Sequence, residues 1–101
     1  MLTITAVIRV KHGCAAIMRD ALLEVAAHVK DNEPDTVGFF ISQDAADPHV
    51  FTTYERFVDR AARDKHNNSA VVARFFGIAK PILEGDVTLV TSVELWEKGS
   101  A

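Results

Sequence analysis

Residues 51–70 read FTTYERFVDRAARDKHNNSA and pass from one type of secondary structure to another. The stretch begins with β-branched and aromatic residues, which favour a strand. Asp59 can then cap a helix, because its carboxylate can accept hydrogen bonds from the free N–H groups of a first helical turn. The pattern therefore predicts a strand followed by a short helix from Asp59 through His66.

The segments on either side of this stretch extend the pattern. Residues 36–43 (TVGFFISQ) and 50–57 (VFTTYERF) flank the turn-forming DAADPH, which predicts an antiparallel hairpin. Ser69 can cap a second helix after His66. The apolar stripe of that helix ends before Pro81 and consists of Val71, Val72, Phe75, Phe76 and Ala79.

The two ends of the chain complete the set of elements. Residues 2–10 alternate with the period of a strand, and the apolar residues of 14–30 recur at helical spacing. DNEPD is expected to stop this helix, because the residue before Pro34 is pushed out of the helical region. Residues 86–97 (DVTLVTSVELWE) alternate again, which predicts a last strand.

The order β-α-β-β-α-β predicts an α+β protein with the ferredoxin-like plan, a four-stranded antiparallel sheet with helices on one face. Phe39 and Phe40 are adjacent in one strand, while Phe51 and Tyr54 point to opposite sides of another. Both sheet faces are therefore partly apolar. We expect a second copy of the chain to cover the helix-free face, giving a homodimer.

Composition limits the classes of protein that remain. The chain has 101 residues, 49% hydrophobic and 25% charged, with a net charge of −3, as expected for one domain over 1–101. It has no apolar run of about 18 residues and no signal-peptide pattern, so we expect a cytoplasmic protein without a membrane partner. Scattered Lys and Arg argue against nucleic acid as a partner. Cys14, the single cysteine, cannot form an internal disulfide.

Three stretches together resemble the antibiotic biosynthesis monooxygenase family of small dimeric α+β-barrel proteins. They are ITAVIRVKHG before a long helix, the NEPD…GFFISQDAADPHVFTTYERF hairpin, and YERFVDRAARDKHNNS. The last carries a recurring family pattern, here Glu55, Ala62, His66 and Ser69. The sequence departs from the family at Asp35, where many relatives have Gly, and at residues 70–71, where many have a second histidine.

The resemblance implies oxygenation of a small electron-rich aromatic, such as a quinol or a polyketide anthrone, by O2 without flavin, haem or metal. Such a site needs a proton acceptor and donor in an apolar cavity. His66, Tyr54 and Glu55 are the candidate catalytic residues that the resemblance implies. The candidate substrate-binding residues are Trp96, Phe40 and Phe75.

Each assignment has a structural alternative. His66 can close a helix by interacting with the helix dipole, in which case it would lie in solvent beside a filled core. Tyr54 and Trp96 can pack in the core or in a dimer interface. Glu55 can pair with a nearby cation, of which the candidates are Arg56, Arg60 and Lys11.

Other functions also remain open. A haem-degrading relative is disfavoured, because such proteins carry Asn on the first strand and Trp after the acidic strand end, where this chain has Thr5 or Ala6 and Phe57. An isomerase of phosphorylated sugars would need cationic residues in the pocket, for which Arg9, Arg56 and Arg74 are the candidates. A dimeric ligand-binding or stress-related protein without catalysis is the alternative from a different class.

Overall fold

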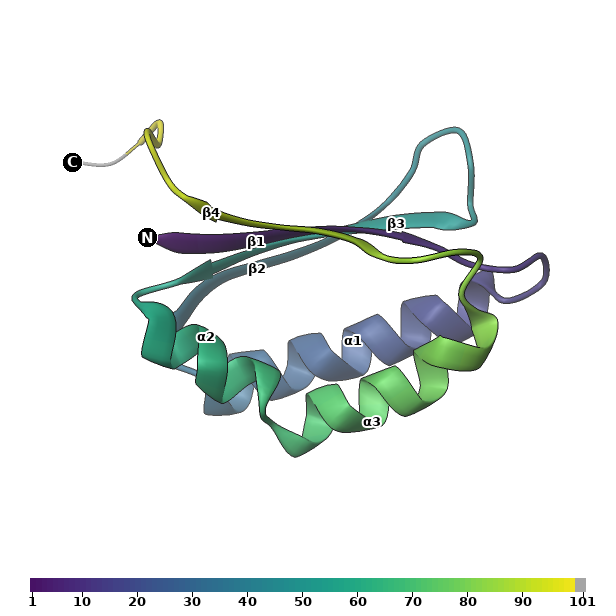
Figure 1. Cartoon of the computed structure of the whole chain (residues 1–101), viewed down its shortest axis with the longest axis horizontal. Coiled ribbons are helices and arrows are strands. Elements are labelled where there is room, and N and C mark those ends of the chain that lie inside the picture. The colour runs from purple at the N-terminus through teal and green to yellow at the C-terminus, as the bar shows by residue number, and fades with distance from the viewer. Residues whose placement is uncertain (100–101) are drawn as a thin grey trace.

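The computed structural model describes residues 1–99, in which a four-stranded antiparallel sheet carries all the α-helices on one face (Figure 1). The elements are β1 (Leu2–Arg9), α1 (Ala15–Asn32), β2 (Thr36–Gln43), β3 (Val50–Phe57), α2 (Arg60–Asn67), α3 (Ala70–Ala79), the 3-10 turn η1 (Lys80–Ile82) and β4 (Thr88–Val93). The strand order is β2-β3-β1-β4, with every neighbouring pair antiparallel. The predicted ferredoxin-like α+β fold is confirmed.

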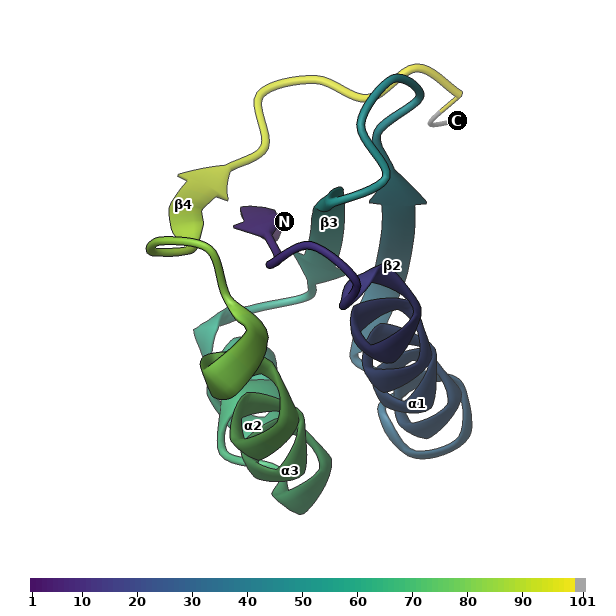
Figure 2. The same ribbon diagram turned by 90° about the vertical axis from the view of Figure 1, so that its right-hand side faces the viewer.

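The central strand β1 supplies the floor of the core. Its alternating apolar residues face the helices, and all of them are buried, namely Leu2, Ile4, Ala6 and Ile8 together with Val10 just beyond the strand. Met18 and Leu22 of α1 pack against this row. Figure 2 shows α1 on one side and α2 and α3 on the other, all beneath the sheet.

The helix ends follow the chemistry expected from the sequence. Asp59 caps α2, with its Oδ1 accepting a hydrogen bond from the Ala62 N–H at 2.8 Å. Ser69 caps α3, with its Oγ accepting from the Val72 N–H at 3.3 Å. α1 ends at Asn32, within the DNEPD stop. Among the described residues, no helix is long and apolar enough to cross a membrane.

The register of the sheet sorts the strand residues onto two faces. Phe39, Glu55 and Ile4 stand side by side on the face that carries the helices. The neighbouring row places Phe40, Tyr54, Thr5 and Val90 on the opposite face, which we call the distal face. Because successive strand residues alternate in direction, adjacent residues such as Glu55 and Tyr54 have different environments.

The last strand differs from the sequence expectation. It covers Thr88–Val93 rather than 86–97, because the chain leaves the sheet at Glu94. The Glu94 N–H still donates to the Met1 carbonyl at 3.0 Å, but its carboxylate reaches across β1 to Arg56. The segment after β4 therefore arches over the distal face instead of continuing the ladder (Figure 2).

Candidate active site

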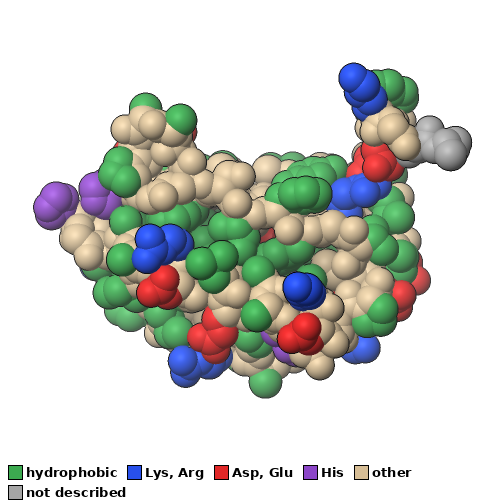
Figure 3. All heavy atoms as spheres, turned by 180° about the vertical axis from the view of Figure 1, so that it is seen from behind, with side chains coloured by type: hydrophobic (Ala, Val, Ile, Leu, Met, Phe, Trp, Pro, Cys, Tyr) green, Lys and Arg blue, Asp and Glu red, His purple; other side chains and the backbone are tan. Residues whose placement is uncertain are grey.

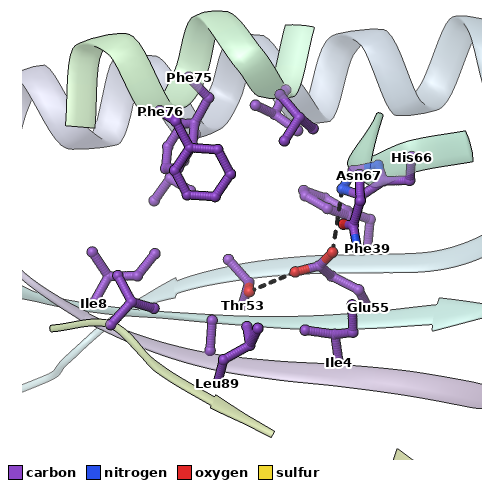
Figure 4. Close-up of a pocket in the computed structure, with 15 residues that line it drawn as sticks. Ile4, Ile8, Phe39, Thr53, Glu55, His66, Asn67, Phe75, Phe76 and Leu89 are labelled. Atoms are coloured by element: carbon purple, nitrogen blue, oxygen red, sulfur yellow. Dashed lines mark hydrogen bonds and ion pairs between the residues drawn. The ribbon is translucent and has the colours of Figure 1, made fainter. Parts of the chain in front are cut away.

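A cavity of about 320 Å³ lies between the sheet and the helices (Figure 4). Its lining is mostly apolar. The apolar residues come from the sheet, the helices and the segment before β4: Ile4, Ala6, Ile8, Leu22, Val25, Phe39, Val72, Phe75, Phe76, Val87 and Leu89. The polar lining residues are Thr53, Glu55, His66 and Asn67. Polar groups confined to one part of an apolar cavity are typical of small-molecule sites.

His66 lies inside the protein, at the cavity wall. It is 4% exposed and stands in the last turn of α2. Its Nδ1 is 2.8 Å from Glu33 Oε1, and its Nε2 is 3.3 Å from Glu55 Oε1. The expectation of a helix-capping histidine in solvent does not fit this burial, although a histidine in the last turn also interacts favourably with the helix dipole.

The two carboxylates decide the charge of His66. Burial alone would lower its pKa, because the cation loses its hydration. The contacts with Glu55 and Glu33 outweigh this effect and raise the pKa of His66 above its ordinary value. The imidazole is therefore held toward its protonated form, with one carboxylate at each nitrogen.

Glu55 is the acidic group that faces the cavity. Its Oε2 accepts a hydrogen bond from Thr53 Oγ1 at 2.9 Å, and Figure 4 shows its carboxylate pointing from β3 toward His66 and Asn67. Among the described residues, no ion pair joins Glu55 to Arg56, Arg60 or Lys11. The side-chain contacts of Glu55 are instead with Thr53 and His66, which also line the cavity.

Glu33 is a site residue that the sequence reasoning missed, because NEPD was interpreted only as a helix stop. It is buried at the end of α1, 33 positions before His66 along the chain. Thr36 Oγ1 donates to its Oε1 at 2.8 Å, and His28 Nε2 lies 3.1 Å from its Oε2. The family-like NEPD stretch was the only available signal, and it carries no information about burial.

The other predicted site residues separate into two groups. Phe75 lines the cavity, beside Phe76 in an edge-on ring contact (Figure 4). Tyr54 and Phe40 lie on the distal face, where their ring centroids are 6.1 Å apart. Trp96 follows β4 and is 79% exposed. Within this chain, His66, Glu55 and Phe75 meet at the cavity, whereas Tyr54, Phe40 and Trp96 do not line it.

Tyr54 instead joins a polar network on the distal face. Its hydroxyl donates to Glu94 Oε2 at 3.1 Å, and Arg56 binds both Glu94 oxygens at 2.9 Å. Arg56 also donates to Glu97 Oε2 at 2.8 Å. The hydrogen bonds from Arg56 lower the pKa of Glu94, while burial and the bond to Glu94 raise the pKa of Tyr54. This network anchors the segment after β4.

The cationic residues that a phosphorylated substrate would need do not line the cavity. Arg9 is exposed and Arg56 binds Glu94 on the distal face. Arg74 binds Glu24 at 2.6 Å on the outer surface of the helices. Among residues 1–99, no cluster of three or more His, Cys, Asp and Glu side chains has an arrangement suited to a metal ion.

Comparisons with known proteins agree with this architecture. A crystal structure of an antibiotic biosynthesis monooxygenase has a TM-score of 0.87 at 24% identity, covering 94% of this chain and 99% of the other. PA3566 from Pseudomonas aeruginosa has a TM-score of 0.85 at 26% identity, covering 94% of both chains. Rv0793 from Mycobacterium tuberculosis has a TM-score of 0.88 at 16% identity, covering 97% and 98%.

No curated protein sequence matches the chain. The family described as antibiotic biosynthesis monooxygenase matches residues 1–77, which contain His66, Glu55, Glu33 and Phe75. Because this match covers more than half of the 101 residues, the chain belongs to the antibiotic biosynthesis monooxygenase family.

Proposed function

We propose that this protein is a cofactor-independent monooxygenase that oxidises a small electron-rich aromatic, such as a quinol or an anthrone, with O2. The observation that carries this proposal is a buried carboxylate, Glu55, held by an imidazole inside a mostly apolar cavity. A base in such surroundings can remove a proton from a phenol or an acidic C–H group. No flavin, haem or metal is required, because the substrate anion itself supplies the electrons.

Glu55, rather than His66, is the group that takes the substrate proton. Both nitrogens of His66 already face carboxylates, at 2.8 Å from Glu33 and 3.3 Å from Glu55. An imidazole held in its protonated form is a poor base. His66 instead lies beside Glu55, where its positive charge stabilises the negative charge that passes to the substrate when Glu55 is protonated.

The reaction balances with O2 as the only oxidant. Glu55 accepts a proton from the quinol, and the anion passes one electron to O2. The resulting radical and superoxide combine at a ring carbon to give a peroxide anion, to which Glu55 returns the proton. Loss of water then yields the hydroxylated quinone, so each quinol and O2 give one product and one water.

The cavity favours a compact, uncharged substrate. Its volume of about 320 Å³ is near the lower end of small-molecule sites, about 300–1,000 Å³. Phe39, Phe75 and Phe76 offer ring faces and edges against which a flat aromatic can pack. The one imidazole among the described lining residues, His66, is already paired with Glu33 and Glu55, so an anionic substrate would meet the Glu55 carboxylate without a free positive charge nearby.

The proposed working unit is a homodimer in which a second copy covers the distal face. Phe40, Tyr54 and Val90 are exposed on this face. The segment after β4 adds Leu95 and Trp96, which are 98% and 79% exposed. The tip of the β2–β3 hairpin and this segment rise at opposite ends of the molecule and leave a saddle between them (Figure 3). Apolar side chains this exposed favour a protein partner.

Oxygen uptake tests the proposed activity. The substrates are reduced menadione and an anthrone, and the uncatalysed rate is subtracted. Wild-type protein is expected to catalyse uptake, and Glu55→Gln, which keeps the shape but removes the base, should lower kcat by about two orders of magnitude or more. His66→Ala should also lower kcat, because the substrate anion that forms when Glu55 takes the proton then lacks a nearby positive charge.

Glu84→Gln is the matched control, because it makes the same chemical change at an exposed residue between η1 and β4 that does not line the cavity. Its kcat should equal that of the wild type. Absence of catalysed uptake by the wild type, together with saturable binding of the same aromatics, would reject the monooxygenase in favour of a ligand-binding protein. Full activity in Glu55→Gln would reject Glu55 as the base.

A further inference from the structure

A continuous row of four ionisable side chains runs from the cavity to the protein surface. Glu55 stands at the cavity, His66 and Glu33 follow, and His28 on α1 ends the row. The successive contacts are 3.3 Å, 2.8 Å and 3.1 Å long. The proposed reaction uses Glu55 and His66 only, so the outer pair, Glu33 and His28, needs a separate explanation.

Glu33 has one oxygen that its structural contacts do not use. Its Oε1 binds both His66 and Thr36. Its Oε2 is fully buried and accepts no hydrogen bond from any described residue, although His28 Nε2 is only 3.1 Å away. The two atoms are close enough for a hydrogen bond but are not aligned as one. A buried carboxylate oxygen without a hydrogen bond lowers the stability of the folded state. Its position beside an imidazole nitrogen therefore needs a functional explanation.

His28 connects this buried oxygen to solvent. Its side chain is 31% exposed, whereas that of Glu33 is 5% exposed. Its Nδ1 lies 3.4 Å from the Asn32 side-chain amide, which also donates to the His28 carbonyl at 3.2 Å. The ring is thus tethered at one nitrogen while the other faces Glu33. An imidazole is the side chain best suited to exchange protons with water near neutral pH.

We propose that Glu33 and His28 form a proton-exchange route between His66 and solvent that bypasses the cavity. In the inward direction, a protonated His28 gives its Nε2 proton to Glu33 Oε2, while the proton shared between Glu33 Oε1 and the Nδ1 of a neutral His66 moves onto His66. His28 loses one proton and His66 gains one. The charge of Glu33 is unchanged, and no atom is oxidised or reduced.

The route has a use when the hydroxylated quinone, which is acidic, leaves as its anion, because the proton that it gives to Glu55 then stays on the Glu55–His66 pair. Glu33 and His28, on the other side of the imidazole, give that proton a way to solvent that does not cross the cavity. This use rests on the proposed monooxygenase function. The exchange itself is measurable in the protein whether or not it oxidises any substrate.

The test is the rate at which the His66 Nδ1–H proton exchanges with water, measured by NMR saturation transfer. In His28→Gln this exchange is expected to slow by roughly tenfold or more, the lower part of the range for losing a positioned acid–base group. His49→Gln is the matched control. His49 also contacts a carboxylate, that of Asp47 at 3.2 Å, and its side chain is likewise 31% exposed, but it lies far from the cavity in the β2–β3 hairpin loop.

A second variant separates proton exchange from a structural role. In His28→Ala, free imidazole in the buffer should restore the exchange rate in proportion to its concentration, while the His49→Ala protein should not respond. An unchanged rate in His28→Gln, or no response of His28→Ala to imidazole, would overturn the route. A wild type inactive in oxygen uptake but with His28-dependent exchange would retain the route and reject only the enzymatic function.

Discussion

At the scale of single residues, the site depends on a cation placed between two buried carboxylates. Glu33 and Glu55 lie on either side of His66, and their contacts raise its pKa and so favour its cationic form. Removing one partner of a buried ionic group leaves an uncompensated charge, which typically costs about 3–5 kcal/mol. The same residues therefore carry both the proposed chemistry and part of the stability of the fold.

His66 is predicted to stabilise the protein more at low pH than at high pH. Its pKa is raised in the folded state, so its contribution is complete below the unfolded value of about 6.5 and is lost as pH rises through the folded value. His66→Gln should lower the free energy of unfolding by about 3 kcal/mol at pH 6 and by less at pH 9. Urea denaturation of both proteins at several pH values measures the difference.

His49→Gln is the control for this pH dependence. It removes a partly exposed surface histidine, so its effect on the free energy of unfolding should stay within about 0.5 kcal/mol at every pH. A difference between wild type and His66→Gln that grows with pH would contradict the assignment of His66 as a cation.

At the scale of elements, α2 is the short helix that carries the site. It has eight residues, and His66 stands in its last turn. Such a short helix is not stable by itself and depends on its caps and on packing. Its cap, Asp59, was predictable from the sequence because capping is a local interaction over a few residues.

Loss of this cap is predicted to affect both stability and activity. Asp59→Ala should lower the free energy of unfolding by about 1 kcal/mol, because the Ala62 N–H loses its acceptor. Oxygen uptake should fall as well, because a frayed α2 positions His66 less firmly. Thermal unfolding and the uptake assay provide the two measurements.

Asp64→Ala makes the same substitution on the same helix without touching a cap. Among residues 1–99, the Asp64 side chain binds only the neighbouring Arg63, at the surface, so this variant should unfold and react like the wild type. Equal effects of the two substitutions would show that the cap does not matter.

At the scale of the whole molecule, the distal face and the segment after β4 leave large apolar side chains in solvent. Leu95 and Trp96 are the clearest cases. Light scattering at micromolar concentration is predicted to give the mass of two chains. Val90→Lys should reduce this to one chain, because it places a charge on the distal face where the second copy would pack.

Val58→Lys is the control for the assembly. Val58 is also an exposed valine, but it follows β3 on the way to α2 and does not belong to the distal row. Its assembly should match that of the wild type. A wild-type protein with the mass of one chain would contradict the dimer.

The sequence by itself determined the order of the elements, the β2–β3 hairpin with its bounds, the two helix caps and the buried row of β1. It also placed Phe39 and Glu55 in the two strands of this hairpin, β2 and β3. These features depend on interactions between residues close in sequence, so the pattern of residue types is enough to predict them.

The tertiary structure decided which polar groups meet. Glu33 and His66 are 33 positions apart, and their contact exists because α1 and α2 pack on the same sheet face. The end of β4 was likewise decided by the distant Arg56, which draws Glu94 away from the ladder. Contacts of this kind depend on how several elements pack at once, and no local pattern of residues encodes that packing.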